Sequence, residues 1–325
     1  MLRPMRRPHT ARLAALGIAG TALGCASTPA PDPRYRPAEN VLEVVAVLRA
    51  HVPDDTYRFE PARDFTGRNV YRSSLLRLES LERVHAEALR AGHLDGVLAF
   101  AKGRSLERLR AFALASGEYQ LAADRDAELA DEARRSAGIC DELDAAAAIG
   151  IDLGKVSSST ARVEDAELEQ VISDFDARRE RQEALESSVA ATHYGPVVRE
   201  EIERTDVARA EYFAALRRAI PNGDVRAIAE LQRVATLHRD SKDAPRHVVA
   251  LARLYEDLAV EYVDANPPQG LLFDPARFQE LVDAASRLYE TVAQQDGRPE
   301  KIEASRRLEA FLAFALRVDH DRFTP

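Results

Sequence analysis

The chain lacks tryptophan, contains only two cysteines and has an aromatic content of 6%. If Cys25 is modified, Cys140 has no partner within the chain, and a disulfide framework is excluded. Cys140 lies in an alanine-rich stretch of helical character, where an isolated cysteine is usually a small buried residue and not a reactive thiol. Alanine and leucine supply most of the apolar side chains instead.

The sequence shows no sustained alternation of apolar and polar residues, and its runs of β-branched residues are short. Such alternation is typical of half-buried strands, whereas alanine, leucine, glutamate and arginine favour helices. A long apolar segment is also missing. The run from Leu13 to Leu23 is shorter than the roughly 20 residues that a membrane-spanning helix needs. We therefore predict an all-α protein without a transmembrane helix.

Acidic residues outnumber basic residues in the main part of the chain. Four of the 45 basic residues lie within residues 1–24, so the remainder carries 41 basic and 54 acidic residues, a net charge of −13. A surface of this sign repels phosphate backbones and anionic lipid headgroups. We therefore expect no nucleic-acid partner, and we expect any membrane attachment to depend on a covalent lipid.

Catalytic and metal-binding motifs are missing as well. The eight histidines do not cluster in the sequence, and no His-Glu-x-x-His occurs. The segment 150–157 departs from a phosphate loop because Val156 stands where Ser or Thr must hold magnesium. We expect Glu200 and Glu201 to be surface charge on a solvated helix, and His85 to be a core histidine. The sequence predicts no catalytic residue, no metal and no cofactor; a hydrolase whose site assembles from distant residues is the alternative.

The first 24 residues have the pattern of a signal peptide, with a basic stretch, an apolar stretch and a small-residue boundary. Ala22-Leu23-Gly24-Cys25 resembles the lipobox of bacterial lipoproteins, whose cysteine is diacylated before cleavage. The resemblance implies a lipid anchor at Cys25. The residues that follow it resemble the outer-membrane sorting pattern of Gram-negative lipoproteins. This resemblance implies an outer-membrane protein that faces the periplasm, with the cell surface as the alternative. An ordinary cleaved signal with an incidental cysteine is the alternative.

The rest of the chain divides into a tether and two helical regions. Residues 25–40 are rich in proline and are expected to form an extended, disordered tether. Glycines and a Ser/Thr run indicate a linker at 150–162, between an N-terminal helical region, 41–155, and a C-terminal one, 163–325. Apolar periodicity predicts helices over 38–51, 69–91, 93–115, 118–135, 137–149, 163–191, 196–219, 224–238, 244–264, 275–295 and 299–319.

Part of this helical pattern resembles the tetratricopeptide repeat. In that family small residues let paired helices pack closely, and a large ring fills the groove between them. The residues that carry the resemblance are Gly103, Leu106, Ala115, Tyr119 and Ala122, then Ala227 and Leu231, then Ala285 and Tyr289. The resemblance implies antiparallel helical hairpins stacked as a degenerate α-solenoid. The spacing between the matches is not constant, and a non-repeating helical bundle is the alternative.

The junction 238–258 resembles the junctions between repeats in outer-membrane lipoproteins of the β-barrel-assembly D-subunit type. Together the resemblances imply a lipid-anchored scaffold for protein–protein interaction in outer-membrane or cell-envelope assembly, not an enzyme, whose protein partner is not identified by the sequence. The alternative is a periplasmic enzyme, or a helical domain that binds cell-wall polymer, with acids and aromatic residues converging in a cleft.

A turn before residue 224 and an apolar loop at 266–273 give two further local predictions. Asp224 follows a turn and is expected to cap the N-terminus of the next helix. The loop 266–273 contains three consecutive apolar residues, Leu271, Leu272 and Phe273. We expect this loop to cap the core, with a contact surface as the alternative.

Overall fold

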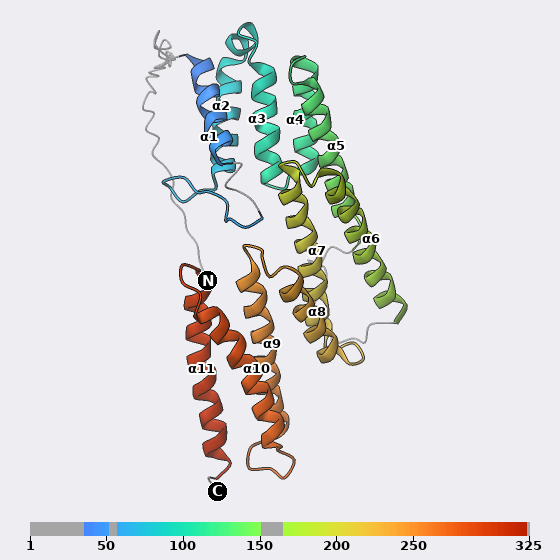
Figure 1. The fold of residues 1–325 in the computed structure, drawn as a ribbon, viewed down its shortest axis with the longest axis vertical. Helices are drawn as coiled ribbons and strands as arrows, with labels where there is room; N and C mark the ends of the chain where they lie inside the picture. Colours follow the sequence, from blue (N-terminus) through green and yellow to red (C-terminus); the bar gives the residue numbers. More distant parts are fainter. Residues whose placement is uncertain (1–35, 52–56, 151–164, 324–325) are drawn as a thin grey trace, which may run out of the picture. The chain divides into compact units, whose positions relative to one another are not determined.

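The computed structural model describes residues 36–51, 57–150 and 165–323, and these residues form eleven α-helices (Figure 1). The only β feature among them is an isolated bridge between Arg63 and Asn69. The prediction of an all-α protein is therefore confirmed for the described part of the chain. The expected signal peptide, Cys25 and all but the last residues of the expected tether lie outside the described residues, as does the expected linker beyond Gly150.

Helices that follow one another in the sequence pack against one another. Every pair of successive helices from α1 to α11 is in contact, and the principal contacts between non-successive helices are α1 with α3 and α9 with α11. Residues Pro37–Pro325 form one compact unit. The helices are α1 (Pro37–His51), α2 (Val70–Ala91), α3 (Asp95–Arg108), α4 (Phe112–Arg125), α5 (Ala130–Ala147), α6 (Asp165–Val189), α7 (Tyr194–Leu216), α8 (Gly223–Leu237), α9 (Ala244–Ala265), α10 (Pro275–Ala293) and α11 (Glu300–Asp321).

The predicted boundaries are close to the observed ones except between residues 93 and 149. There the sequence places a break near residue 116, but the chain turns at Arg110, which has a left-handed backbone (φ 63°). No glycine marks this turn, whereas Gly117 lies inside α4 without disturbing it. The next break is made by Asp126, whose carboxylate accepts hydrogen bonds from the backbone N–H groups of Glu128 and Leu129 before α5.

Helix starts in the C-terminal part depend on capping and proline. Asp274 accepts hydrogen bonds from the backbone N–H groups of Ala276 and Arg277, and Pro275 occupies the first helical position of α10. The expectation that Asp224 caps α8 is wrong. The helix already begins at Gly223, and the carboxylate of Asp224 pairs with Arg217 at 2.7 Å.

The loop between α9 and α10 also differs from expectation. Leu271 and Leu272 are 104% and 81% exposed, so these two residues do not cap the core. Phe273 alone packs inward, against Tyr262 and Phe278. His85 is half-buried at a kink within α2. In the described residues no helix combines the length and the apolar character that a membrane crossing requires.

Candidate functional site

Helix α7 carries a row of four buried carboxylates: Glu200, Glu201, Glu203 and Asp206. The expectation that Glu200 and Glu201 are solvated surface charges is wrong, because their exposed fractions are only 8% and 4%. Helices α6 and α8 pack against α7, and residues that flank α3 and α9 reach it as well. Charges in such a position remain ionised only when each of them has a partner.

Each of the first three carboxylates has a partner from outside α7. Glu200 pairs with Lys242, and Glu201 accepts hydrogen bonds from Nε and Nη2 of Arg110 at 2.5 and 2.7 Å. The side chain of Arg110 therefore links the turn between α3 and α4 to α7. Glu203 accepts hydrogen bonds from the Ser241 hydroxyl at 2.6 Å and from His247 Nε2 at 2.5 Å.

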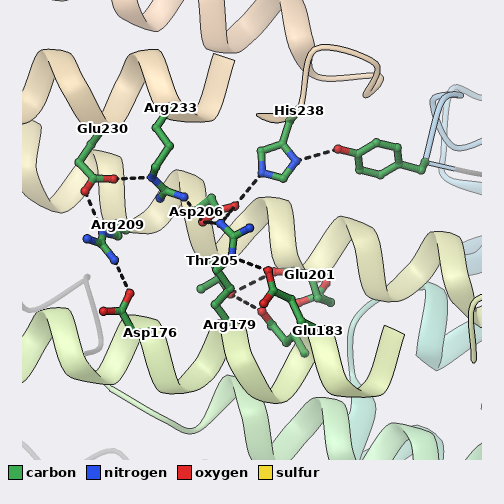
Figure 2. A network of polar contacts seen from close by, with 12 residues as sticks. Asp176, Arg179, Glu183, Glu201, Thr205, Asp206, Arg209, Glu230, Arg233 and His238 are labelled. Atoms are coloured by element: carbon green, nitrogen blue, oxygen red, sulfur yellow. Dashed lines mark hydrogen bonds and ion pairs between the residues drawn. The ribbon is translucent and has the colours of Figure 1, made fainter. Parts of the chain in front are cut away.

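Asp206 is the centre of the network in Figure 2. Arg179 of α6 donates to both carboxylate oxygens, at 2.6 and 2.7 Å, Arg233 of α8 donates at 2.8 Å, and His238 Nε2 lies at 2.8 Å. Burial alone would raise the pKa of Asp206. The hydrogen bonds from His238 and Arg233, with the charges of Arg233 and Arg179, outweigh that effect and lower the pKa below its usual value.

The network continues from His238 to Tyr57, which precedes α2 in the sequence. The phenol oxygen lies 2.8 Å from His238 Nδ1, and the carbonyl of Tyr57 accepts a hydrogen bond from the backbone N–H of Lys242. Burial, helped by the charge of Glu203, raises the pKa of Tyr57, so the phenol keeps its proton at neutral pH. His238 therefore bridges the two residues, with Nδ1 facing the phenol of Tyr57 and Nε2 facing the carboxylate of Asp206.

His238 and His247 lie side by side, with ring centroids 6.3 Å apart, although they do not form a motif in the sequence. Each imidazole contacts its own carboxylate, Asp206 or Glu203. Burial would raise the pKa of Glu203, but the hydrogen bonds from His247 and Ser241 and the adjacent imidazoles lower it. Within the described ranges no three His, Cys, Asp or Glu side chains are placed to hold a metal ion.

A cavity of about 670 Å³ opens beside this network, and its walls come from segments far apart in the sequence. Arg179 and Arg199 lie on α6 and α7, His238 lies in the α8–α9 turn, and Tyr57 precedes α2. Arg199 lies over the Tyr57 ring, 5.8 Å from its centroid, and pairs with Glu186 at 3.4 Å. The volume falls within the range of about 300–1,000 Å³ that is typical of ligand sites. Charges of both signs line the cavity.

The residues that carry the repeat resemblance lie in the core and not in this cavity. Ala115, Tyr119 and half-buried Leu106 belong to one apolar cluster, and Ala122 belongs to a neighbouring one. A Cβ atom on Gly103 would come within 2.8 Å of the Tyr119 ring, so this glycine makes room for the ring. The other pairs lie in two further clusters, Ala227 with Leu231 and Ala285 with Tyr289. The structure does not bring the three sets together.

Sequence reasoning missed the polar residues that do come together. Asp206, His238 and Tyr57 are scattered over more than half of the chain, and no spacing rule relates them. One signal was available. Glu200, Glu203 and Asp206 are spaced by three, which places all of them on one face of a helix. The sequence matches no protein-family model and no curated protein.

Proposed function

We propose that this protein is a lipid-anchored component of the bacterial cell envelope that acts as a helical-repeat scaffold for binding other proteins. The proposal includes a degenerate tetratricopeptide-like α-solenoid, similar to outer-membrane-assembly lipoproteins of the D-subunit type. The packing of each helix on its neighbours in sequence supports it, because stacked repeats make contacts mainly of that kind. The fit of the Tyr119 ring against Gly103, between α3 and α4, is the kind of packing that a repeat hairpin uses.

The cavity of about 670 Å³ beside Asp206 and His238 is the observation that carries the binding function. It is open, and its wall includes Arg58, Arg199 and Glu186. Such a wall suits a polypeptide segment that carries both acidic and basic side chains, because its charges can exchange with partly exposed ion pairs such as Arg199–Glu186. The outer membrane, facing the periplasm, is the location that we propose.

The carboxylates beside the cavity favour binding over acid–base catalysis. A carboxyl group that donates a proton near neutral pH needs a raised pKa. The pKa values of Asp206 and Glu203 are lowered, and both side chains are already engaged by cations or hydrogen-bond donors. This arrangement supports a role in holding the helices together around the cavity.

The lipid anchor is tested with the full chain expressed in a Gram-negative host, as wild type and as Cys25→Ser. We expect the wild-type protein to enter the detergent phase on phase separation and to incorporate labelled palmitate. The variant should remain in the aqueous phase without label. A wild-type protein that partitions like the variant would refute the anchor.

The binding function is tested by photo-crosslinking in the same host. Leu237 lies in the cavity wall and is 51% exposed, whereas Leu114 on α4 is 65% exposed and lies outside it, so the second position is a matched control. A photoreactive phenylalanine analogue at Leu237 should crosslink a discrete protein, and Arg199→Glu should reduce that product. Crosslinks to glycan fragments alone would favour a domain that binds cell-wall polymer. Equal crosslinking from both positions would refute a binding site here.

A further inference from the structure

A second, smaller cavity of about 410 Å³ lies between α1, α3 and the residues just before α5 and α7. Most of its wall is apolar. The side chains that supply this apolar wall are Val45, Leu48, Val97, Phe100, Ala101 and Leu129. Because the wall belongs mainly to helices, whose backbone groups bond to one another, it offers few backbone partners for the amides of a peptide.

Arg104 of α3 lies in this cavity, and its side chain is only 13% exposed. The guanidinium group is 5.4 Å from the ring centroids of Phe100 and Tyr194 and 5.8 Å from that of Tyr119. Arginine stacked on aromatic rings in this way is held in a fixed orientation. A buried cation is therefore presented at a defined place in a mostly apolar cavity.

All hydrogen bonds of Arg104 are made through one nitrogen. Nη1 contacts Glu107 Oε2 at 3.1 Å, the Tyr194 hydroxyl at 3.3 Å, and His193 Nε2. Nε and Nη2 have no hydrogen-bond partner among the residues that the structure describes. The guanidinium therefore has an unused pair of donor nitrogens, the side that binds a carboxylate in a two-point contact.

The charges around the cavity leave an excess of positive charge. Glu107 balances the charge of Arg104. Burial, together with the charge of Arg104, lowers the pKa of His193 to about 4, so its ring is neutral at pH 7. Arg49 lies in the wall on α1, is exposed, and has no ion pair within the described ranges. One net positive charge matches a monoanion better than a dianionic phosphate.

We propose that this cavity binds an amphiphile with a single apolar chain and one carboxylate, with the carboxylate on Nε and Nη2 of Arg104 and the chain along the apolar wall. Arg49 adds a second, weaker contact at the exposed side. Fatty acids have this chemistry. The site is separate from the cavity beside Asp206, and the proposal does not depend on the scaffold function.

The test uses the full chain with Cys25→Ser, so that the proposed anchor contributes no acyl chain of its own. Titration calorimetry with octanoate, below its micellar concentration, should give one site per chain. Octanol has the same chain without the charge and should bind at least about tenfold more weakly, because hydrogen bonds to a charged group are worth about 1.5–3 kcal/mol. Equal affinity for octanoate and octanol would overturn the proposal.

Two variants locate the site. Ala101→Leu adds bulk to the wall and should weaken octanoate binding by more than about tenfold. Arg49→Gln should weaken it about two- to fivefold, as expected for an exposed charge, whereas Arg135→Gln on α5, 64% exposed, should have no effect. Thermal melts confirm that each variant is folded. Unchanged octanoate affinity in folded Ala101→Leu or Arg49→Gln protein would overturn the assignment of the site.

A final titration distinguishes a free amphiphile from a protein terminus. The probes are a hexapeptide that ends in a free leucine carboxylate and the same peptide with a C-terminal amide. Octanoate should bind more tightly than either peptide. A peptide acid that binds more tightly than octanoate, while its amide does not bind, would overturn the amphiphile in favour of a chain terminus.

Discussion

The phenol of Tyr57 and the imidazole of His238 are hydrogen-bonded at 2.8 Å across a separation of 181 residues. This contact fastens the segment before α2 to the turn between α8 and α9. A backbone hydrogen bond from Lys242 to the Tyr57 carbonyl and an ion pair between Arg246 and Glu60 support the same attachment. The wall of the larger cavity is complete only when this segment is in place, because Tyr57 and Arg58 both belong to it.

Tyr57→Phe should loosen this segment while the helices stay folded. The substitution removes one hydrogen bond and leaves His238 Nδ1 without its partner, which should lower the free energy of unfolding by about 1–2 kcal/mol. The measurement is urea denaturation of the full chain, together with the rate of tryptic cleavage after Arg58 and Arg63. We expect faster cleavage at these sites in the variant.

Tyr255→Phe is the matched control for that experiment. Its hydroxyl also has a side-chain hydrogen bond, to Gln232 at 3.2 Å, but that contact is exposed. The control should change the free energy of unfolding by less than about 0.5 kcal/mol. If the two tyrosine variants behave alike, the Tyr57–His238 contact does not fasten the segment.

Asp206→Asn should be the most damaging single change in the polar network. The variant keeps the size of the side chain but leaves Arg179, Arg233 and His238 around a neutral amide in a buried position. Removal of one partner from a buried ion pair typically costs about 3–5 kcal/mol. Equilibrium urea denaturation measures the loss.

Asp176→Asn provides the comparison for Asp206→Asn. Asp176 is 60% exposed and pairs with Arg209, which retains Glu230 as a second partner. Such an exposed pair contributes at most about 1 kcal/mol. Comparable losses in the two variants would mean that Asp206 does not hold the helices together.

The sequence predicts the helices well because burial of apolar stripes leaves a periodic record. Apolar residues spaced by three or four are buried in α9, at Leu251 and Leu254, and in α10, at Ala285 and Tyr289. The site leaves no such record. A carboxylate on α7 looks the same in the sequence whether it faces water or Arg110, and the difference depends on which distant helices cover it. The turn at Arg110 could not be predicted from the sequence either. Its left-handed backbone is adopted by an arginine, whereas glycine is the residue that usually marks such a position.

His193 should make the protein sensitive to mild acid. Its pKa is lowered from 6.5 to about 4 by burial and by the charge of Arg104. Between these values the unfolded chain takes up a proton that the folded chain does not, so the free energy of unfolding falls as pH drops from about 6.5 towards 4. The lowered pKa values of Asp206 and Glu203 affect stability in a more acidic range. The stability that these two carboxylates confer is present above the pKa of the unfolded carboxyl groups. It is lost as pH falls through the pKa values of the folded state.

The measurement is thermal unfolding at pH 7.5, 6.5, 5.5 and 4.5. His193→Gln keeps an acceptor for Arg104 but cannot be protonated, so its melting temperature should fall less than that of the wild type over this range. His320→Gln, at a side chain that is 76% exposed, should follow the wild-type curve. A His193→Gln curve parallel to that of the wild type would show that another group causes the acid sensitivity.

Gly103→Ala should destabilise the protein although alanine is the better helix former. The added Cβ would approach the Tyr119 ring to 2.8 Å, and the ring is fully buried and hydrogen-bonded through its hydroxyl to Glu107, so it cannot move aside freely. Overpacking of this kind typically costs about 1–3 kcal/mol, more than the roughly 0.5–1 kcal/mol that alanine gains over glycine within a helix.

Gly117→Ala in the adjacent α4 isolates the gain in helix propensity. A Cβ atom at Gly117 would meet nothing within 4 Å, so that variant should be stabilised. Urea denaturation of both variants therefore gives changes of opposite sign if the Gly103–Tyr119 contact sets the distance between α3 and α4, and changes of the same sign if it does not.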